Sequence, residues 1–365
     1  MRPPVYAIVA AISLAAYPAF AQADRTAAAF WKTVQARCGA SAAKPSNELG
    51  RRIAQTAIDE FTRFSGHQID SNGRLFHFGL TEAEHKEEHG GGGPARLGDL
   101  GWKRVMKYWR VLYDNDTAEK LELRGYRDAS SATDEAQAAA PLRTNAAQLL
   151  RAAEAVSDPA AREILREAVL RAAIIDTPWS AAFISYVIRQ SGVTASAFKF
   201  ANAHRVFIYD AFAASAAEET NEAGKWLYRA CPLTTRPRLG DLVCQQREPA
   251  LAEASDEAVR ERIRADLAGP ADASTVRRTH CEVVAHVDEP ARKVYTIGGN
   301  VNQSVTARKL NLRDDLRFSA MQKSHCGGSG EWTLPEPSTD ASSAANLTKN
   351  CSLNDKKWFV LLQLR

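Results

Sequence analysis

A serine at the start of an apolar helical run has the clearest potential for chemistry in this sequence. Ser180 follows Pro178 and Trp179 and precedes an apolar segment that begins at Ala181. A proline just before such a run marks where a helix begins, so Ser180 is expected in the first turn. Unpaired N–H groups and the positive end of the helix dipole favour a developing negative charge there. An oxyanion that formed on a carbonyl beside Ser180 would be stabilised by the N–H of Ser180 or Ala181, so Ser180 is a candidate nucleophile. The alternative is a serine that only caps the helix.

A hydroxyl nucleophile needs a base, and the base needs a polar partner that holds its ring in one orientation. His280 opens a predicted strand, and Asn300 ends the next strand after two glycines. If a tight hairpin loop joins Asp288 to Lys293, His280 pairs with the residue after Asn300. A one-residue shift or a bulge then brings Asn300 opposite His280. The spacing predicts a triad in which Ser180 attacks, His280 takes the proton and Asn300 orients the imidazole.

Two other segments with histidine offer different chemistry. His204 follows the nucleophile helix and could line the cleft with Trp179 or act as an alternative base, although a packed or solvent-facing position is the simpler interpretation. The segment from His85 to His89 matches the H-x-x-E-H zinc pattern of inverted metallopeptidases. Four glycines follow it directly and no third ligand is evident, so a solvated charged turn is preferred. No metal or organic cofactor is expected.

The cysteines predict disulfides. Their even number in an exported chain favours bridges, and none has the paired spacing of a zinc site. Strand alternation sends Cys281 to the face opposite His280, where it could bridge to Cys244 behind the catalytic face. A bridge from Cys326 to Cys351 would anchor a Gly/Ser-rich segment, and the remaining pair follows by elimination. The six are Cys38, Cys231, Cys244, Cys281, Cys326 and Cys351.

The first residues predict export. Arg2 supplies a positive start, an apolar segment follows, and Ala19-Phe20-Ala21 is a small-x-small cleavage site. We expect residues 1–21 to be a signal peptide cleaved after about Ala21, which places the mature chain in the periplasm or outside the cell. No later segment approaches the ~20 apolar residues of a transmembrane helix.

The charge balance argues against nucleic acid as a partner. The chain has 47 Lys and Arg residues against 43 Asp and Glu residues, a formal net charge of +4. Loss of the signal peptide removes one basic residue and leaves about +3. That excess is too small to indicate a nucleic-acid surface, although it would not repel an anionic wall polymer. The oligomeric state stays open.

The elements that must position these residues predict an α+β protein. Residues 22–140 form a helical N-terminal region that packs on the core and ends in a small, polar linker. Residues 141–365 form an α+β domain with a helical insertion near 248–268. Helices are expected within residues 24–63, 102–113 and 145–175, and strands within residues 239–244, 280–287, 293–297, 304–312 and 358–364.

The order of these motifs is similar to that of the CHAP/NlpC-type papain-like amidases. The similarity comprises a P-W-S-A-A-F helix, a G-D-L strand, a strand that opens with histidine and a strand that ends in G-G-N, over roughly residues 174–312. The resemblance implies a papain-like core with Ser180 in place of the nucleophile cysteine, His280 as base and Asn300 as orienter. It looks closest to an exported bacterial branch that carries serine at this position.

The resemblance implies an amidase or peptidase that acts on cell-wall peptide. Ser180, His280 and Asn300 would carry that reaction, and peptidoglycan or a wall-derived peptide would be the partner. Because replacing sulfur by oxygen lowers nucleophilicity, a second hypothesis is a weakened papain-fold module that binds peptidoglycan or a periplasmic partner.

Overall fold

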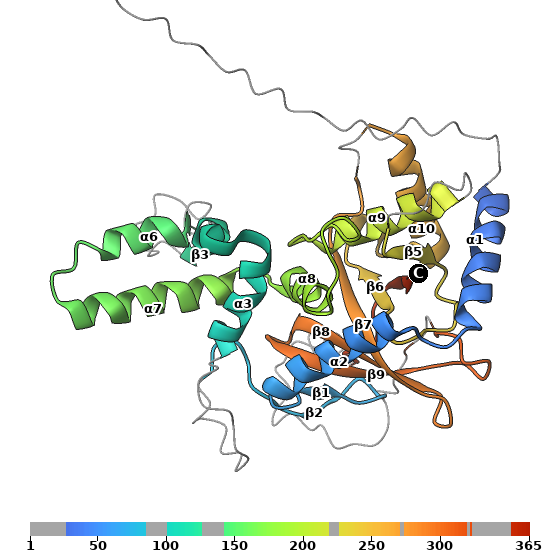
Figure 1. The fold of residues 1–365 in the computed structure, drawn as a ribbon, viewed down its shortest axis with the longest axis horizontal. Coiled ribbons are helices and arrows are strands. Elements are labelled where there is room, and N and C mark those ends of the chain that lie inside the picture. The colour runs from blue at the N-terminus through green and yellow to red at the C-terminus, as the bar shows by residue number, and fades with distance from the viewer. Residues whose placement is uncertain are drawn as a thin grey trace, which may run out of the picture.

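An eight-stranded sheet forms the centre of this computed structural model (Figure 1). The structure describes residues 27–84, 101–125, 142–218, 226–270, 274–319, 322 and 352–365. The strand order is β2-β1-β9-β8-β7-β6-β10-β5, and every neighbouring pair is antiparallel except β1 and β9. The strands are β1 Gln68–Ile69, β2 Leu75–His77, β5 Tyr228–Cys231, β6 Leu242–Gln246, β7 Thr279–Asp288, β8 Lys293–Val301, β9 Ser304–Asn311 and β10 Trp358–Leu364.

Helices surround this sheet, so the predicted α+β class is confirmed. A separate two-stranded sheet contains β3 Glu122–Gly125 and β4 Leu142–Asn145. The α-helices are α1 Ala27–Ala42, α2 Glu48–Arg63, α3 Gly101–Tyr113, α4 Thr117–Lys120, α6 Ala146–Ala153, α7 Pro159–Asp176, α8 Ser180–Gln190, α9 His204–Ala217 and α10 Asp256–Ala268. Two short 3-10 turns are η2 Asp114–Asp116 and η5 Pro249–Leu251.

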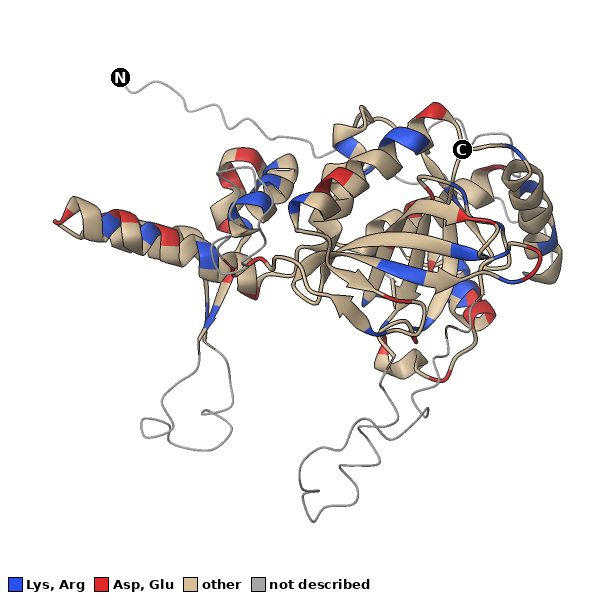
Figure 2. Cartoon of the chain, turned by 90° about the horizontal axis from the view of Figure 1, so that it is seen from below, with Lys and Arg blue, Asp and Glu red and all other residues tan. Residues whose placement is uncertain are grey.

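The helix expected over residues 145–175 is divided into α6 and α7. Asp158 accepts a hydrogen bond from the Ala161 N–H at 3.0 Å, and Pro159 occupies the first turn, so α7 begins anew at this point. Figure 1 shows α6 and α7 projecting away from the large sheet, and Figure 2 shows charges of both signs along α7. Several apolar side chains of these two helices are therefore exposed, with Ile164 at 70% of its full accessibility.

The N-terminal region supplies strands as well as helices. β1 pairs with β2 and also lies parallel to β9, so this region extends the large sheet. α2 carries Ile53 and Ala57, which are fully buried in the same apolar cluster as α8. The two parts expected at residues 22–140 and 141–365 thus share one sheet and one core.

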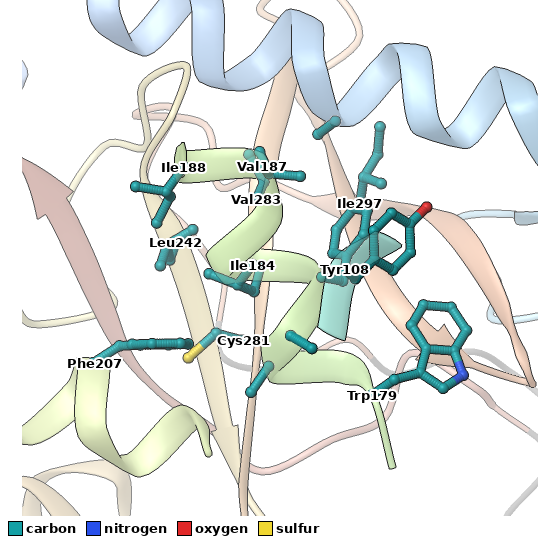
Figure 3. Packing of buried hydrophobic residues seen from close by; sticks show 14 of the residues in the cluster. Tyr108, Trp179, Ile184, Val187, Ile188, Phe207, Leu242, Cys281, Val283 and Ile297 are labelled. Atoms are coloured by element: carbon teal, nitrogen blue, oxygen red, sulfur yellow. The ribbon is translucent and has the colours of Figure 1, made fainter. Parts of the chain in front are cut away.

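Apolar side chains fill both faces of the sheet. On one face, Ile184, Val187 and Ile188 of α8 pack with Leu242, Val283 and Ile297 of the strands (Figure 3). On the other face, Phe30 and Val34 of α1 pack with strand residues that alternate with the first set. Burial on both faces gives β7 a nearly continuous run of buried residues.

The hairpin of β7 and β8 contains the register shift on which the predicted triad depends. Asp288 pairs with Lys293, but the register shifts after Val284, and Val283 pairs with Ile297. The irregularity lies at Ala285, between the two registers. The paired residues of β7 and β8 end at Val283 and Ile297, and β8 has a further irregularity between Gly298 and Val301, so His280 and Asn300 are not a register pair.

Two predicted disulfides are present. Cys244 and Cys281 face each other across β6 and β7, with Cα atoms 4.1 Å apart. Cys38 joins Cys231, with Cα atoms 5.9 Å apart. The predicted bridge between Cys326 and Cys351 lies outside the described residues, as do the predicted signal peptide, the predicted linker and the H-x-x-E-H segment.

Within the described ranges, no helix is both long and apolar enough to cross a membrane. The same ranges contain no group of three or more His, Cys, Asp or Glu side chains that could hold a metal ion.

Candidate functional site

The start of α8 is held in place by packing of Trp179. α7 ends at Asp176, and Ser180 is the first residue of α8. Trp179 precedes it and is fully buried, with ring centroids 6.0 Å from Phe64 and 5.8 Å from Tyr108. The indole thus ties the helix start to α2 and α3, which restricts movement of the neighbouring serine.

Ser180 and His204 form a direct hydrogen bond. Their Oγ and Nε2 atoms are 2.8 Å apart, and the side chains project from the first residues of α8 and α9. Both residues are buried, with 8% and 4% of their surfaces exposed. Of the two histidines weighed as bases, His204 is therefore the one that contacts Ser180.

A backbone hydrogen bond decides which nitrogen of His204 carries the proton. The Cys281 N–H donates to His204 Nδ1 at 3.2 Å, so Nδ1 holds a lone pair. In a neutral imidazole the other nitrogen must then carry the hydrogen. Nε2–H therefore donates to Ser180 Oγ.

His204 is neutral as well as oriented. Burial, the nearby His280 and the positive charge of Arg247 hold its pKa well below the usual value of 6.5. Protonation would also place an Nδ1–H against the Cys281 N–H, which is a contact between two donors. The ring thus acts as a donor to Ser180 and has no free lone pair directed at it.

The hydrogen of the Ser180 hydroxyl remains available. Its oxygen accepts from His204, and within the described ranges no acceptor receives its own O–H. The first satisfied N–H of α8 is that of Phe183, which donates to the Trp179 carbonyl at 3.0 Å. The earlier N–H groups of Ser180, Ala181 and Ala182 have no intrahelical acceptor. The helix start therefore presents several donors and suits a carbonyl or carboxylate oxygen.

His280 lies on the other face of β7 from α8. Cys281 and Val283 pack in the cluster that contains α8, and neighbouring strand residues point to opposite faces. The His280 ring is near His204, with ring centroids 4.9 Å apart, but Ser180 bonds to His204. This differs from the predicted triad, and the disulfide of Cys281 lies on the α8 side rather than behind it. Alternation alone could not choose the face, because both faces are buried.

Glu282 is the polar partner of His280 that the sequence analysis missed. Its Oε1 lies 3.4 Å from His280 Nε2 and accepts a hydrogen bond from Arg308 Nε at 2.7 Å, while Oε2 accepts from Thr296 Oγ1 at 2.6 Å. Burial opposes the charge, but Arg308 and the other donors outweigh it and lower the Glu282 pKa to about 2. The missed signal is the spacing of two residues from His280, which puts both on one strand face.

His280 is also neutral. Burial lowers its pKa from 6.5, although the Glu282 carboxylate acts in the opposite direction. The ion pair of Glu282 with Arg308 already balances that carboxylate. The geometry therefore gives a neutral histidine beside a paired carboxylate, with Glu282 rather than Asn300 as its observed contact.

The two glycines before Asn300 allow close approach of β8 to the site. A Cβ atom on Gly299 would lie 2.4 Å from Phe183 Cβ, and one on Gly298 would lie 3.1 Å from His280 Nε2. Asn300 itself has a φ of +54°, in the left-handed region that asparagine tolerates, and adjoins a register shift between β8 and β9. The G-G-N motif thus lets β8 approach its neighbours closely and adopt a left-handed backbone conformation at Asn300.

Residues 97–364 match the family model described as "Uncharacterized protein conserved in bacteria (DUF2272)". The chain belongs to this family. No curated protein and no solved structure matches it significantly.

The DUF2272 match includes the whole cluster described above. Ser180, His204, His280 and Glu282 all lie within residues 97–364, together with the strands β5 to β10. α1, α2, β1 and β2 precede the matched segment. The disulfide of Cys38 with Cys231 therefore links a residue before the DUF2272 segment to one inside it.

Proposed function

We propose that this DUF2272 protein is a papain-like module that binds cell-wall peptide, with an acyl oxygen of the peptide held at the start of α8. The observation that carries this proposal is the hydrogen bond from the Cys281 N–H to His204 Nδ1. It makes His204 a donor, so Ser180 has no base directed at it and its own hydroxyl hydrogen is free to bind a ligand oxygen.

Two further features support a binding role for this site. The N–H groups of the first turn of α8 add donors beside the Ser180 hydroxyl, and the helix dipole favours a negatively polarised oxygen. Peptide as the ligand class rests on the resemblance to the CHAP/NlpC-type amidases. Export to the periplasm or the cell exterior would bring the protein to that ligand, and the two disulfides fit an oxidising compartment.

The first experiment measures binding of the whole protein to purified peptidoglycan and the appearance of new amino groups. We expect binding without amino-group release. Ser180→Ala removes one donor worth about 1 kcal/mol, so binding should weaken roughly fivefold. Ser196→Ala, at an exposed serine, is the matched control and should bind like wild type. Equal binding by wild type and Ser180→Ala would overturn the proposed site.

A hydrolase is the second candidate function. It is favoured by the 2.8 Å separation of Ser180 Oγ and His204 Nε2, which is short enough for proton transfer once Nε2 carries a lone pair. In that case wild type would release amino groups from peptidoglycan and Ser180→Ala would not. That outcome would show that the protein is an enzyme and would overturn the proposed binding role.

A further inference from the structure

A basic cavity lies away from the Ser180 site. It has a volume of about 590 Å³ and is lined by residues of α1, β5, the end of α9 and the turn before β6. Its charged lining comprises Arg37, Lys44, Arg229, Arg238, Arg365 and one acid, Glu218. Five basic side chains against one acidic side chain give the lining a formal charge of +4. The volume is in the range of small-molecule sites rather than that of a single ion.

Two carboxylates balance only part of this positive charge. Glu218 lies 2.9 Å from both Arg229 and Arg365 and so is shared between two guanidinium groups. Arg238 lies 4.0 Å from the buried Asp241 carboxylate and donates to the Ser41 carbonyl at 3.0 Å. Arg37 and Lys44 form no ion pair within the described residues. The positive charge of the cavity is therefore only partly balanced.

Three buried guanidinium nitrogens in this lining have no acceptor in the part of the chain that the structure describes. They are Arg37 Nη1, Arg229 Nε and Arg238 Nε. A buried donor without a partner destabilises the folded protein, and more so when the group is charged. Burial and the neighbouring Arg365 and Arg238 also lower the pKa of Arg229, although Glu218 opposes this. An anionic ligand would accept hydrogen bonds from the unpaired N–H groups and would reduce the repulsion among the arginines.

A disulfide fixes the cavity walls relative to each other. Cys38 follows Arg37 on α1, and Cys231 lies two residues after Arg229 on β5. The bridge holds two of the arginines on elements that are 193 residues apart in sequence. Because the positive charges are already held together, binding an anion does not require the entropy loss of bringing them into place.

We propose that this cavity binds a phosphate group, either free or as the ester of a larger ligand. Several planar guanidinium groups that converge from different elements match the oxygens of a phosphate, which they bind through paired hydrogen bonds. A phosphate carries about −1.5 to −2 charge at pH 7, so it balances the excess better than a single carboxylate. The site is independent of the proposed function of Ser180.

The test is calorimetric titration of the whole protein with inorganic phosphate at constant ionic strength, with acetate as the reference anion. We expect phosphate to bind more tightly than acetate. Arg37→Gln should weaken phosphate binding about tenfold, because one charge-assisted hydrogen bond is worth about 1.5 kcal/mol or more. Arg37 has no partner among the described residues, so this change should leave the fold intact. Arg51→Gln, at an exposed α2 arginine paired with Glu48, is the matched control and should bind like wild type.

Vesicles distinguish the sources of the phosphate. Sedimentation with phosphatidic acid vesicles, compared with phosphatidylcholine vesicles, reports a lipid headgroup. Phosphate binding with no preference for phosphatidic acid assigns a free or non-lipid phosphate, and a preference lost in Arg37→Gln assigns a headgroup. The proposal is overturned if neither inorganic phosphate nor phosphatidic acid binds, or if Arg37→Gln binds both like wild type.

Discussion

At the residue scale, the position of the proton on His204, rather than the distance of the ring from Ser180, determines whether this histidine can act as a base. A histidine 2.8 Å from a serine hydroxyl has the spacing of a catalytic pair. The Cys281 N–H occupies Nδ1, however, and so selects the tautomer that donates to Ser180. The sequence proposed His204 as an alternative base but contains no signal for this bond, because residues 204 and 281 are brought together only by folding.

We predict that His204 resists protonation. ¹⁵N-detected spectra should show hydrogen on Nε2 and a lone pair on Nδ1, with a pKa well below 6.5 because the ring is buried near His280 and Arg247. A spectrum with the hydrogen on Nδ1 at neutral pH would contradict the donor role and favour the hydrolase.

The same shift predicts a stability effect of pH. Below pH 6.5 His204 is protonated in the unfolded state but stays neutral in the folded state. The free energy of unfolding therefore falls as the pH falls. Relative to His204→Gln, wild type should lose at most about 1.4 kcal/mol of unfolding free energy per pH unit below 6.5. Chemical denaturation of both proteins at pH 7.5 and 5.5 measures the difference. A constant difference between them would refute the lowered pKa.

At the element scale, the close approach of β8 to Phe183 of α8 accounts for Gly299, and its approach to Glu282 and His280 of β7 accounts for Gly298. The sequence suggested the motif through its order after His280, but the paired residues of β7 and β8 end at Val283 and Ile297. The strands β6 to β10, the helix start and the disulfide between Cys244 and Cys281 could be predicted from local patterns, whereas Cys38 with Cys231 followed only by elimination. The face on which α8 packs could not, since both faces of β7 carry buried residues.

Gly299→Ala should destabilise the protein by about 1–3 kcal/mol, because its new methyl group would lie 2.4 Å from Phe183 Cβ and force α8 away from the sheet. Gly39→Ala is the matched control. A Cβ there meets nothing within 4 Å inside α1, so the change should stabilise by up to about 1 kcal/mol. Urea denaturation compares the two, and equal effects would argue against the tight contact.

At the scale of the whole molecule, one sheet joins segments that the sequence assigned to two parts. β1 of the N-terminal region lies beside β9, and the C-terminal strand β10 lies between β5 and β6. The bridge from Cys38 to Cys231 spans 193 residues, and that from Cys244 to Cys281 spans 37. The long bridge therefore restricts the unfolded chain more.

Replacing Cys38 and Cys231 together by alanine should cost about 1.5 kcal/mol more than the same change at Cys244 and Cys281. The difference follows from the lengths of the loops that the two bridges close. All four cysteines are fully buried, so the two double variants lose similar amounts of packing. Thermal or urea unfolding of the two double variants measures it. A larger cost for the short bridge would show that native packing, rather than loop closure, dominates.

The sequence by itself determined the α+β class, most of the strands, the helix that begins at Ser180 and the pairing of Cys244 with Cys281, because periodicity, proline and alternation act over a few residues. Only the tertiary structure decided that Ser180 meets His204, that Glu282 meets Arg308 and that five cations line one cavity. These contacts join residues 24 to more than 300 positions apart, and their geometry depends on which sheet face receives each helix.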